Sequence, residues 1–171
     1  MGQLKALLPW RGVTLLEHQI RSLIDAGVCH VVVVLGHEAN LLKPVVESVD
    51  GAHWVLNGDY LEGKTTSIKS GVSDLIPSHT RHVVLLSVDQ PRRADTVRTL
   101  LQRHTSSFNK MTIPTYRGKG GHPIILAEPV LPEVMKIEEE TQGLLAVVRR
   151  HSDETDRFEI DDPSLIWDLN T

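Results

Sequence analysis

The sequence predicts an α/β fold in which a mostly parallel sheet is covered by helices on both faces. Two apolar runs, "HVVVVLG" at 30–36 and "HVVLLSV" at 82–88, lack the polar alternation of a half-exposed strand. Such runs are typical of strands that are buried on both faces. Helical patterns separate these runs, and this alternation of strand and helix is typical of a parallel sheet between two helical layers.

The first predicted helix covers residues 14–26. Thr14 and Glu17 have the spacing of a capping box, and Gly27 is the natural end of the helix. The apolar residues form one stripe, made of Leu16, Ile20, Leu23 and Ile24.

The other elements continue the alternation. Further helices are predicted over residues 40–49, 65–76, 95–104, 129–137 and 142–151. Further strands are predicted over residues 53–57, 111–116, 122–126, 157–162 and 166–170. The strand at 111–116 contains Pro114, which has no amide hydrogen, so we expect this strand at an edge or an end of the sheet.

Composition indicates one globular domain over residues 1–171. The net charge is −4 and no basic run exceeds two residues, so we expect no nucleic-acid partner. No apolar stretch is long enough to cross a bilayer or to form a signal core, so we expect a cytoplasmic protein without a membrane partner. Cys29 is the single cysteine and precedes an apolar run, so it is expected to be a small buried hydrophobic residue.

The clearest candidate for chemistry is Asp89 in "LLSVDQP", where a buried strand ends and Pro91 turns the chain away. Ligands of parallel sheets bind at the carboxyl ends of the strands. A carboxylate there suits Mg²⁺, which takes few protein oxygens and shares the rest with phosphates and water. The alternative is that Asp89 only caps the following turn.

Two glycine-containing segments are candidates for the same edge. Lys5 follows Gly2 in "MGQLKALLPW" and can neutralise a phosphate, although a solvated surface lysine is the alternative. In "YRGKGGHPIIL", Gly120 and Gly121 precede His122 and allow the backbone to approach a ligand. A flexible hairpin loop is the alternative there.

The segment from Asn57 onward places polar groups before a helix whose free N–H groups attract anions. Gly71 lies inside that helix and is expected to pack closely against a neighbour. The chain has no G-x-S-x-G motif, so the sequence does not indicate a covalent nucleophile.

Taken in order, several segments resemble the MobA-like nucleotidyltransferases. They are "MGQLKALLPWRGVTLLEHQIRSLIDAG", "VVVVLGH", "VLNGDYLEGKTTSIKSGV", "VVLLSVDQP", "PTYRGKGGHPIIL" and "DDPSLIWDLNT". The "DQP" and "GHP" elements resemble the branch that contains molybdenum cofactor cytidylyltransferases. The similarity extends over essentially the whole chain.

The resemblance implies a Rossmann-like, GT-A-type fold with three α/β/α layers. It also implies transfer of CMP or GMP from CTP or GTP to a phosphorylated acceptor, here of the molybdopterin type, with release of pyrophosphate. Lys5 and Asp89 would be the catalytic residues, and Asp89 would bind Mg²⁺ together with Asn170, which stands where the family commonly has Asp. The nucleotide-binding positions would be Gly2, Lys5, Leu8, Asn57, Gly71 and Asp89. The acceptor-binding positions would be Ser67, Gly120, Gly121 and His122.

The sequence departs from the family pattern at both ends. The family begins with a strand that leads into "L-A-A-G-x-S-x-R", and this piece is absent before Gly2. The chain also stops at Thr171, before the usual "PED" and closing helix. Without the interior strand, we expect a slot lined with Val and Ile, unpaired backbone groups on both sides of it, and poor nucleotide binding. The chain would then either pair with another chain or leave the slot open, as a monomer or a weak homo-oligomer.

Two rival functions remain open from the sequence. One is a sugar-phosphate or polyol-phosphate nucleotidyltransferase on the same fold. The other is a non-catalytic relative, a binding or assembly module that kept the sheet and lost the loop.

Overall fold

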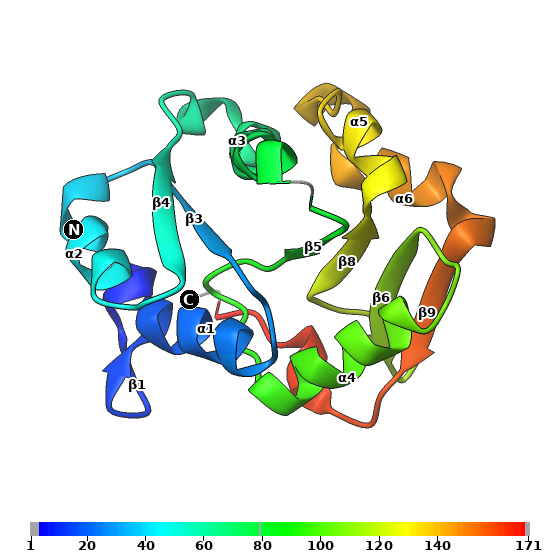
Figure 1. Ribbon diagram of the computed structural model, residues 1–171, viewed down its shortest axis with the longest axis horizontal. Helices are drawn as coiled ribbons and strands as arrows, with labels where there is room; N and C mark the ends of the chain where they lie inside the picture. The colour runs from blue at the N-terminus through cyan, green and yellow to red at the C-terminus, as the bar shows by residue number, and fades with distance from the viewer. Residues whose placement is uncertain (1–3, 79, 170–171) are drawn as a thin grey trace.

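A computed structural model describes residues 4–78 and 80–169 of the chain (Figure 1). Its strands are β1 Pro9–Trp10, β2 Val13–Thr14, β3 Val31–Leu35, β4 Ala52–Leu56, β5 His82–Leu85, β6 Met111–Tyr116, β7 Lys119–Gly120, β8 Ile124–Ala127 and β9 Thr155–Glu159. Its α-helices are α1 Leu15–Asp25, α2 Ala39–Glu47, α3 Lys64–Leu75, α4 Ala94–Thr105, α5 Leu131–Val134 and α6 Leu144–Arg150. Short 3₁₀ helices are η1 Lys5–Leu7, η2 Tyr60–Glu62, η3 Ile76–Ser78, η4 Glu128–Val130, η5 Glu139–Thr141, η6 Ser152–Glu154 and η7 Pro163–Ile166.

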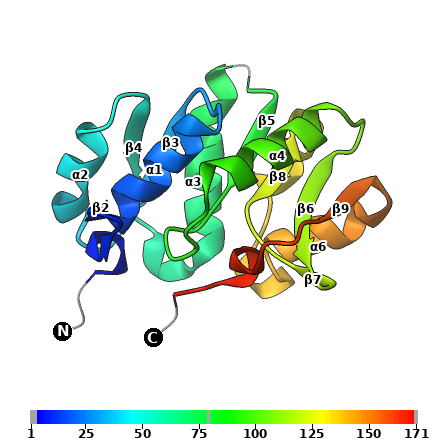
Figure 2. The same cartoon turned by 90° about the horizontal axis from the view of Figure 1, so that it is seen from below.

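The strands form a central layer between two layers of helices. Helices α1, α2 and α4 cover one face, and α3, α5 and α6 cover the other (Figures 1 and 2). Strands β3 and β4 pair in parallel, as do β6 and β9, whereas β8 runs antiparallel to both β5 and β6. The predicted three-layer α/β class is therefore confirmed.

The start of α1 follows directly from the sequence. Thr14 is the N-cap, and its hydroxyl accepts a hydrogen bond from the amide of Glu17 at 3.2 Å. Gly27 follows the helix with a φ of 102°, a left-handed conformation that glycine adopts without strain. The apolar stripe predicted for this helix includes Leu16 and Ile20, which are both buried.

The central layer is divided by a gap between β3 and β5. Strand β3 pairs only with β4, and β5 pairs only with β8, so no strand in the described part of the chain lies between them. The buried apolar residues correspondingly form two clusters, one around β3, α1 and α2 and the other around β6, β8, α5 and α6. Among the described residues, the slot expected in the sheet is therefore present between β3 and β5.

The expectation that Pro114 places residues 111–116 at a sheet edge is wrong. Strand β6 lies inside its sheet, with β9 on one side and β8 and β7 on the other. On one side, β6 pairs with β7 and then with β8, and residues 121–123 separate these two strands. The carbonyl of Pro114 points to this side and accepts a hydrogen bond from the amide of Gly121 at 2.8 Å. Because the N and C=O of one strand residue point to the same side, the missing N–H of Pro114 falls at this interruption.

Two other expectations are also wrong. Residues 166–169 form no strand: Ile166 ends η7, and residues 167–169 follow it. The carboxylate of Asp162 caps η7 by accepting the amide of Ser164 at 2.9 Å. Cys29 is exposed, because it lies in the loop between α1 and β3 rather than in the strand itself. Within the described residues, no helix has the length and apolar character required to cross a membrane.

A buried histidine gives folding a distinct pH dependence. His104 is 1% exposed, and its ring nitrogens contact the Thr112 hydroxyl at 2.9 Å and the His82 ring at 3.1 Å. Burial lowers the pKa of His104 to about 4, and the neighbouring His82 adds to the effect. The unfolded chain therefore takes up a proton on His104 before the folded chain does, so the free energy of unfolding falls as the pH drops from 6.5 toward 4.

We expect this histidine to lower the free energy of unfolding by about 2 kcal/mol between pH 7 and pH 5. Urea unfolding of the wild-type chain and of His104→Gln at both pH values measures the effect, because glutamine keeps a hydrogen-bonding side chain but does not titrate. The variant should be less stable at pH 7 and should lose about 2 kcal/mol less than the wild type on acidification. Equal losses in the two proteins would contradict the prediction.

Candidate functional site

Lys5 and Asp89 meet at the carboxyl ends of β3 and β5. Lys5 lies in η1, Asp89 follows β5, and the Lys5 Nζ and Asp89 Oδ2 atoms are 4.0 Å apart. Both side chains remain partly accessible, at 35% for Lys5 and 25% for Asp89. The two predicted catalytic residues are thus neighbours on one rim of the domain.

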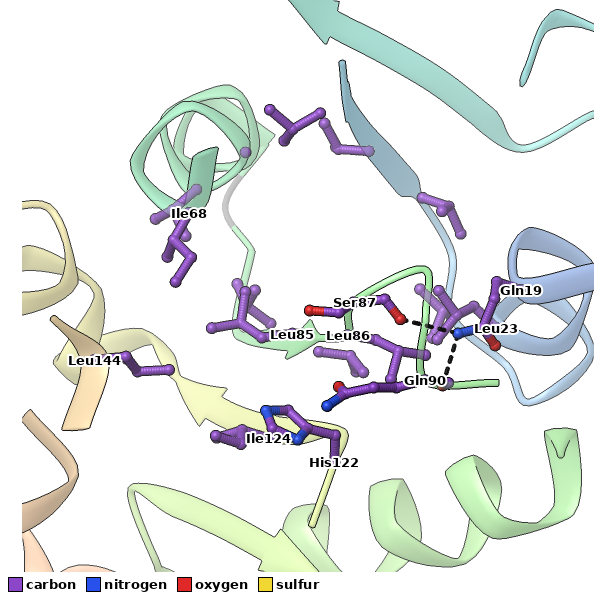
Figure 3. Close-up of a pocket in the computed structure, with 18 of the residues that line it drawn as sticks. Gln19, Leu23, Ile68, Leu85, Leu86, Ser87, Gln90, His122, Ile124 and Leu144 are labelled. Atoms are coloured by element: carbon purple, nitrogen blue, oxygen red, sulfur yellow. Dashed lines mark hydrogen bonds between the residues drawn. The ribbon is translucent and has the colours of Figure 1, made fainter. Parts of the chain in front are cut away.

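Helix α1 holds the loop that carries Asp89. The side-chain amide of Gln19 donates to the carbonyl of Ser87 at 3.1 Å and to that of Gln90 at 2.8 Å (Figure 3). The Gln19 carbonyl accepts the amide of Arg92 at 3.0 Å, and the Ser22 hydroxyl donates to the Arg92 carbonyl at 2.7 Å. These four bonds fix the loop to a helix of the other half of the domain.

Arg92 connects the same loop to the C-terminal segment. The residue is 1% exposed, and its guanidinium donates to the carbonyls of Pro91 at 2.9 Å, His122 at 2.7 Å and Leu165 at 2.9 Å. Burial lowers the pKa of Arg92 to about 10, although the negative charges of Asp162, Asp168 and Asp89 raise it. The group therefore remains charged at neutral pH.

The glycine-rich segment before β8 lies against this C-terminal segment. A Cβ on Gly121 would lie 2.3 Å from the carbonyl oxygen of Leu165, so only glycine fits there. Gly120 belongs to β7 and is exposed. Both glycines lie beside the cavity described below, together with His122.

His122 presents its ring to the site while its backbone is held on both sides. Its amide donates to the Leu165 carbonyl at 3.3 Å, and its own carbonyl accepts from Arg92. Burial lowers the pKa of His122; the positive charges of Arg92 and Lys64 also lower it, against Asp168 and Asp89. The imidazole is therefore neutral at pH 7 and can donate one hydrogen bond and accept another.

Asn57 and Ser67 organise the start of α3. Asn57 is 4% exposed, and its side-chain amide donates to the hydroxyls of Thr66 at 2.9 Å and Ser67 at 3.0 Å. Both N–H groups of the Asn57 side chain are therefore used inside the protein. The first amide of the helix, that of Lys64, donates to the carboxylate of Glu139 at 3.0 Å, so one of the expected anion-attracting groups already has a carboxylate partner.

A cavity of about 1660 Å³ joins most of the predicted residues. It extends from the gap between β3 and β5 to the rim and is lined by Lys5, Ser67, Gly71, Asp89, Gly120, Gly121 and His122. Leu8 and Asn57 do not line it. Gly2 and Asn170 lie outside the described residues.

Gly71 marks a close contact inside the cavity wall. A Cβ at this position would lie 3.0 Å from Cγ2 of Val34, so the glycine lets α3 approach β3. The packing predicted from the sequence is confirmed, and a nucleotide contact by Gly71 stays a prediction.

Sequence reasoning missed Arg92, Gln19 and Gln90. Arg92 follows directly after "DQP", but nothing in the sequence distinguishes it from the exposed Arg93 beside it. Gln90 lines the cavity beside His122 (Figure 3), and its buried side-chain oxygen has no hydrogen-bond partner within the described residues. Gln90 thus places a buried, unpaired acceptor beside the cavity.

The described side chains at the rim supply too few ligands to hold a divalent cation by themselves. No group of three or more His, Cys, Asp or Glu residues suited to a metal occurs in the described parts of the chain. Asp89 is partly accessible. Its negative charge and that of Asp168 both raise the pKa of Arg92 and of His122, so the two carboxylates act on the same part of the site. Mg²⁺ needs only one or two carboxylates when phosphates and water complete its shell, so this donor set suits such an ion.

The family model of the MobA-like NTP transferase domain matches residues 1–155. The chain belongs to this family. The predicted enzyme class, a nucleotidyltransferase, is confirmed by this membership.

Two relatives show how far the similarity extends. The molybdenum cofactor cytidylyltransferase of Escherichia coli (strain K12) is 26% identical, over 100% of this chain and 84% of its own length. The nicotine blue oxidoreductase of Paenarthrobacter nicotinovorans is 27% identical, over 98% of this chain and 83% of its own length.

Solved structures support the fold. Rv0371c from Mycobacterium tuberculosis H37Rv superposes with a TM-score of 0.80 at 23% identity, covering 95% of this chain and 82% of that one. Its complex with manganese superposes with a TM-score of 0.78 at 21% identity, covering 99% and 88%. The GT-A-type arrangement expected from the sequence is thus shared with known structures.

We expect Arg92→Ala to lower the free energy of unfolding by about 3–5 kcal/mol, because it leaves buried carbonyls of three segments without their charged donor. Arg93→Ala is the matched control, since the Arg93 side chain is 65% exposed, and its effect should stay within about 0.5 kcal/mol. Chemical denaturation of the three proteins measures the difference. A small effect of Arg92→Ala would show that the C-terminal segment is held by other contacts.

Proposed function

We propose that the domain transfers CMP or GMP from CTP or GTP to a phosphorylated acceptor and releases pyrophosphate. The observation that supports this most is the meeting of Lys5, Asp89 and His122 on one cavity at the carboxyl ends of the strands. An ammonium, a carboxylate and a neutral imidazole are the groups expected around a polyphosphate, its cation and its acceptor.

The chemistry is an in-line displacement at the α-phosphorus of the nucleotide. An oxygen of the acceptor phosphate forms the new bond, and pyrophosphate leaves with the electrons of the broken bond. Lys5 neutralises charge on the triphosphate as it develops, and no covalent intermediate with the protein is needed. Catalysis by position and charge agrees with the lack of an obvious nucleophile in the sequence.

Asp89 is the residue proposed to hold Mg²⁺ at the rim, and Asn170 is the second ligand predicted from the sequence. Bound there, the ion would neutralise charge on the phosphate oxygens. The described neighbour Leu169 donates its amide to the carbonyl of Asp89 at 2.9 Å, which supports a C-terminal contribution to this rim. The manganese complex of Rv0371c also supports a divalent cation on this fold.

The proposed acceptor is a molybdopterin-type phosphate. The similarity to the Escherichia coli molybdenum cofactor cytidylyltransferase supports this choice. The imidazole of His122 lines the cavity and offers a hydrogen-bonding group suited to the amino and ring nitrogens of a pterin or a cytosine.

The gap in the sheet favours a second candidate, a binding module with little activity. The cavity is continuous from the gap to the rim, so a nucleotide at the rim lacks a wall on the side of the gap. We therefore propose that residues 1–171 alone bind nucleotide weakly, with a Kd of about 1 mM or higher.

The first test compares the Mn²⁺ affinity of Asp89→Asn with that of Asp95→Asn. Each protein is titrated with Mn²⁺ in the presence of CTP, and binding is detected by water proton relaxation. Asp89→Asn removes the charge that holds the ion, so the affinity for Mn²⁺ should fall at least about tenfold. Asp95 is 72% exposed on α4, so its replacement should change nothing. Unchanged Mn²⁺ binding by Asp89→Asn, with folding intact, would remove the metal role of this residue.

The second test measures nucleotide binding by saturation-transfer NMR and pyrophosphate release by the 171-residue chain. CTP or GTP should bind weakly and in preference to ATP and UTP, and turnover should stay near the background with pterin, sugar and polyol phosphates as acceptors. Rapid pyrophosphate release would contradict the weak binding, and the acceptor that supports it would identify the substrate class. If none of the four nucleotides bound, the transferase proposal itself would fail.

A further inference from the structure

A second cavity, of about 220 Å³, lies beside the loop that carries Asp89. Its walls come from the β1–β2 hairpin, α1, the end of that loop and the segment around η7. The first and last segments of the chain lie at the same end of the molecule (Figure 2). The loop connects the two cavities, because Asp89 and Gln90 line the large one and residues 91–93 line the small one. No described residue lines both.

Positive charge prevails in the walls of the second cavity. Arg11, Arg92 and Arg93 line it, whereas Asp162 is the one carboxylate among its described lining residues. The Asp162 carboxylate already accepts two hydrogen bonds from the protein, one from an amide and one from a hydroxyl, both at 2.9 Å. His18 also lines the cavity and is neutral at pH 7, because burial and the charge of Arg11 lower its pKa. A partly enclosed space with an excess of fixed positive charge attracts anions.

Two of the three arginines can form new bonds. Arg92 uses its guanidinium on protein carbonyls, so it contributes charge rather than contacts. Arg11 is exposed and is held in the tight β1–β2 turn, where it and Gly12 have φ values of 51° and 91°. The Arg93 side chain is 65% exposed, and its Nη2 atom lies 3.7 Å from the Asp95 carboxylate, beyond hydrogen-bond distance. The guanidinium groups of Arg11 and Arg93 are therefore able to pair with an oxyanion.

Two polar atoms of residues in the walls lack a partner within the described chain. They are the indole Nε1 of Trp10 and the hydroxyl Oγ of Ser164, and both atoms are buried. A buried donor without a partner costs about 1–3 kcal/mol, and a bound ion or water is a common reason for such a group. Because indole and guanidinium groups only donate hydrogen bonds, the species that completes this cavity is an acceptor.

A phosphate group suits this set of donors better than a carboxylate. The donors come from four segments around the cavity, and a tetrahedral phosphate accepts from several directions, whereas a carboxylate accepts in one plane. The volume of 220 Å³ corresponds to about seven water molecules, which is more space than a phosphate group alone occupies. The ring of Pro91 and the indoles of Trp10 and Trp167 line the same space, so they can cover a small organic group.

We propose that this second cavity binds a phosphate monoester that carries a small organic group. Arg11 and Arg93 pair with the phosphate oxygens, and the indole rings of Trp10 and Trp167 cover the organic group. The ligand contacts the loop of Asp89 through residues that lie outside the large cavity. The site is therefore separate from the one proposed for the nucleotide, and it does not depend on whether the domain transfers nucleotides.

The first test titrates the ¹⁵N-labelled 171-residue protein with phenyl phosphate and follows the indole N–H signals of its three tryptophans by NMR. The signals of Trp10 and Trp167 should shift with one Kd of about 1 mM or lower. The Trp54 signal should stay in place, because Trp54 does not line the cavity. Replacing each tryptophan by phenylalanine in turn assigns the three signals. Inorganic phosphate should bind at least about fivefold more weakly, because it lacks the group that packs on the rings, and phenol should not bind.

The second test locates the phosphate group with arginine variants. Arg11→Gln and Arg93→Gln should each weaken the binding of phenyl phosphate at least about tenfold, because each removes a charged donor. Arg21→Gln is the matched control, since Arg21 is exposed on α1, lines neither cavity and should leave the affinity unchanged. Lys5→Gln should also keep the affinity, because Lys5 lines only the large cavity. The spectrum of each variant shows whether it is folded.

Three results would overturn the proposal. Binding that is weakened by Lys5→Gln but not by Arg11→Gln would place the ligand in the large cavity. Equal affinities for inorganic phosphate and phenyl phosphate would leave no role for the indole rings. An unchanged Trp10 signal at about 10 mM phenyl phosphate would show that the second cavity does not bind the ester.

Discussion

The contact on which the rest of the structure depends is the set of hydrogen bonds between α1 and the loop from Ser87 to Arg92. In a continuous sheet, main-chain bonds between neighbouring strands would hold β3 and β5 together. Here the side chains of Gln19 and Ser22 bind four main-chain groups of the loop, and so join two halves whose strands do not touch. The position of Asp89 relative to Lys5 follows from this connection.

Arg92 extends the connection to the C-terminal part of the chain. Its guanidinium group donates to the carbonyls of Pro91 in the loop, His122 before β8 and Leu165 in η7, so it joins three segments that are far apart in the sequence. Hydrogen bonds from a charged donor are stronger than neutral ones, and a buried carbonyl without a donor is costly. The His122 loop and the residues up to Trp167 therefore depend on a residue that itself need not contact a ligand.

Two residues predicted from the sequence to contact a ligand have structural tasks, and their contact with a ligand stays a prediction. Asn57 uses both N–H groups of its amide to shape the turn before α3, and Gly121 is required by the approach of the Leu165 carbonyl. His122 and Gln90, by contrast, line the cavity.

The sequence by itself determined the capped start of α1, the fold class and the position of Asp89 in the loop that follows β5, because these depend on local periodicity and on short-range hydrogen bonds. It also indicated the family, through several motifs in order. Only the tertiary structure decided that β6 is interior despite Pro114, that residues 166–169 form no strand, and that Arg92 rather than Arg93 is buried. Each of these depends on contacts between residues far apart in the chain, which no local pattern encodes.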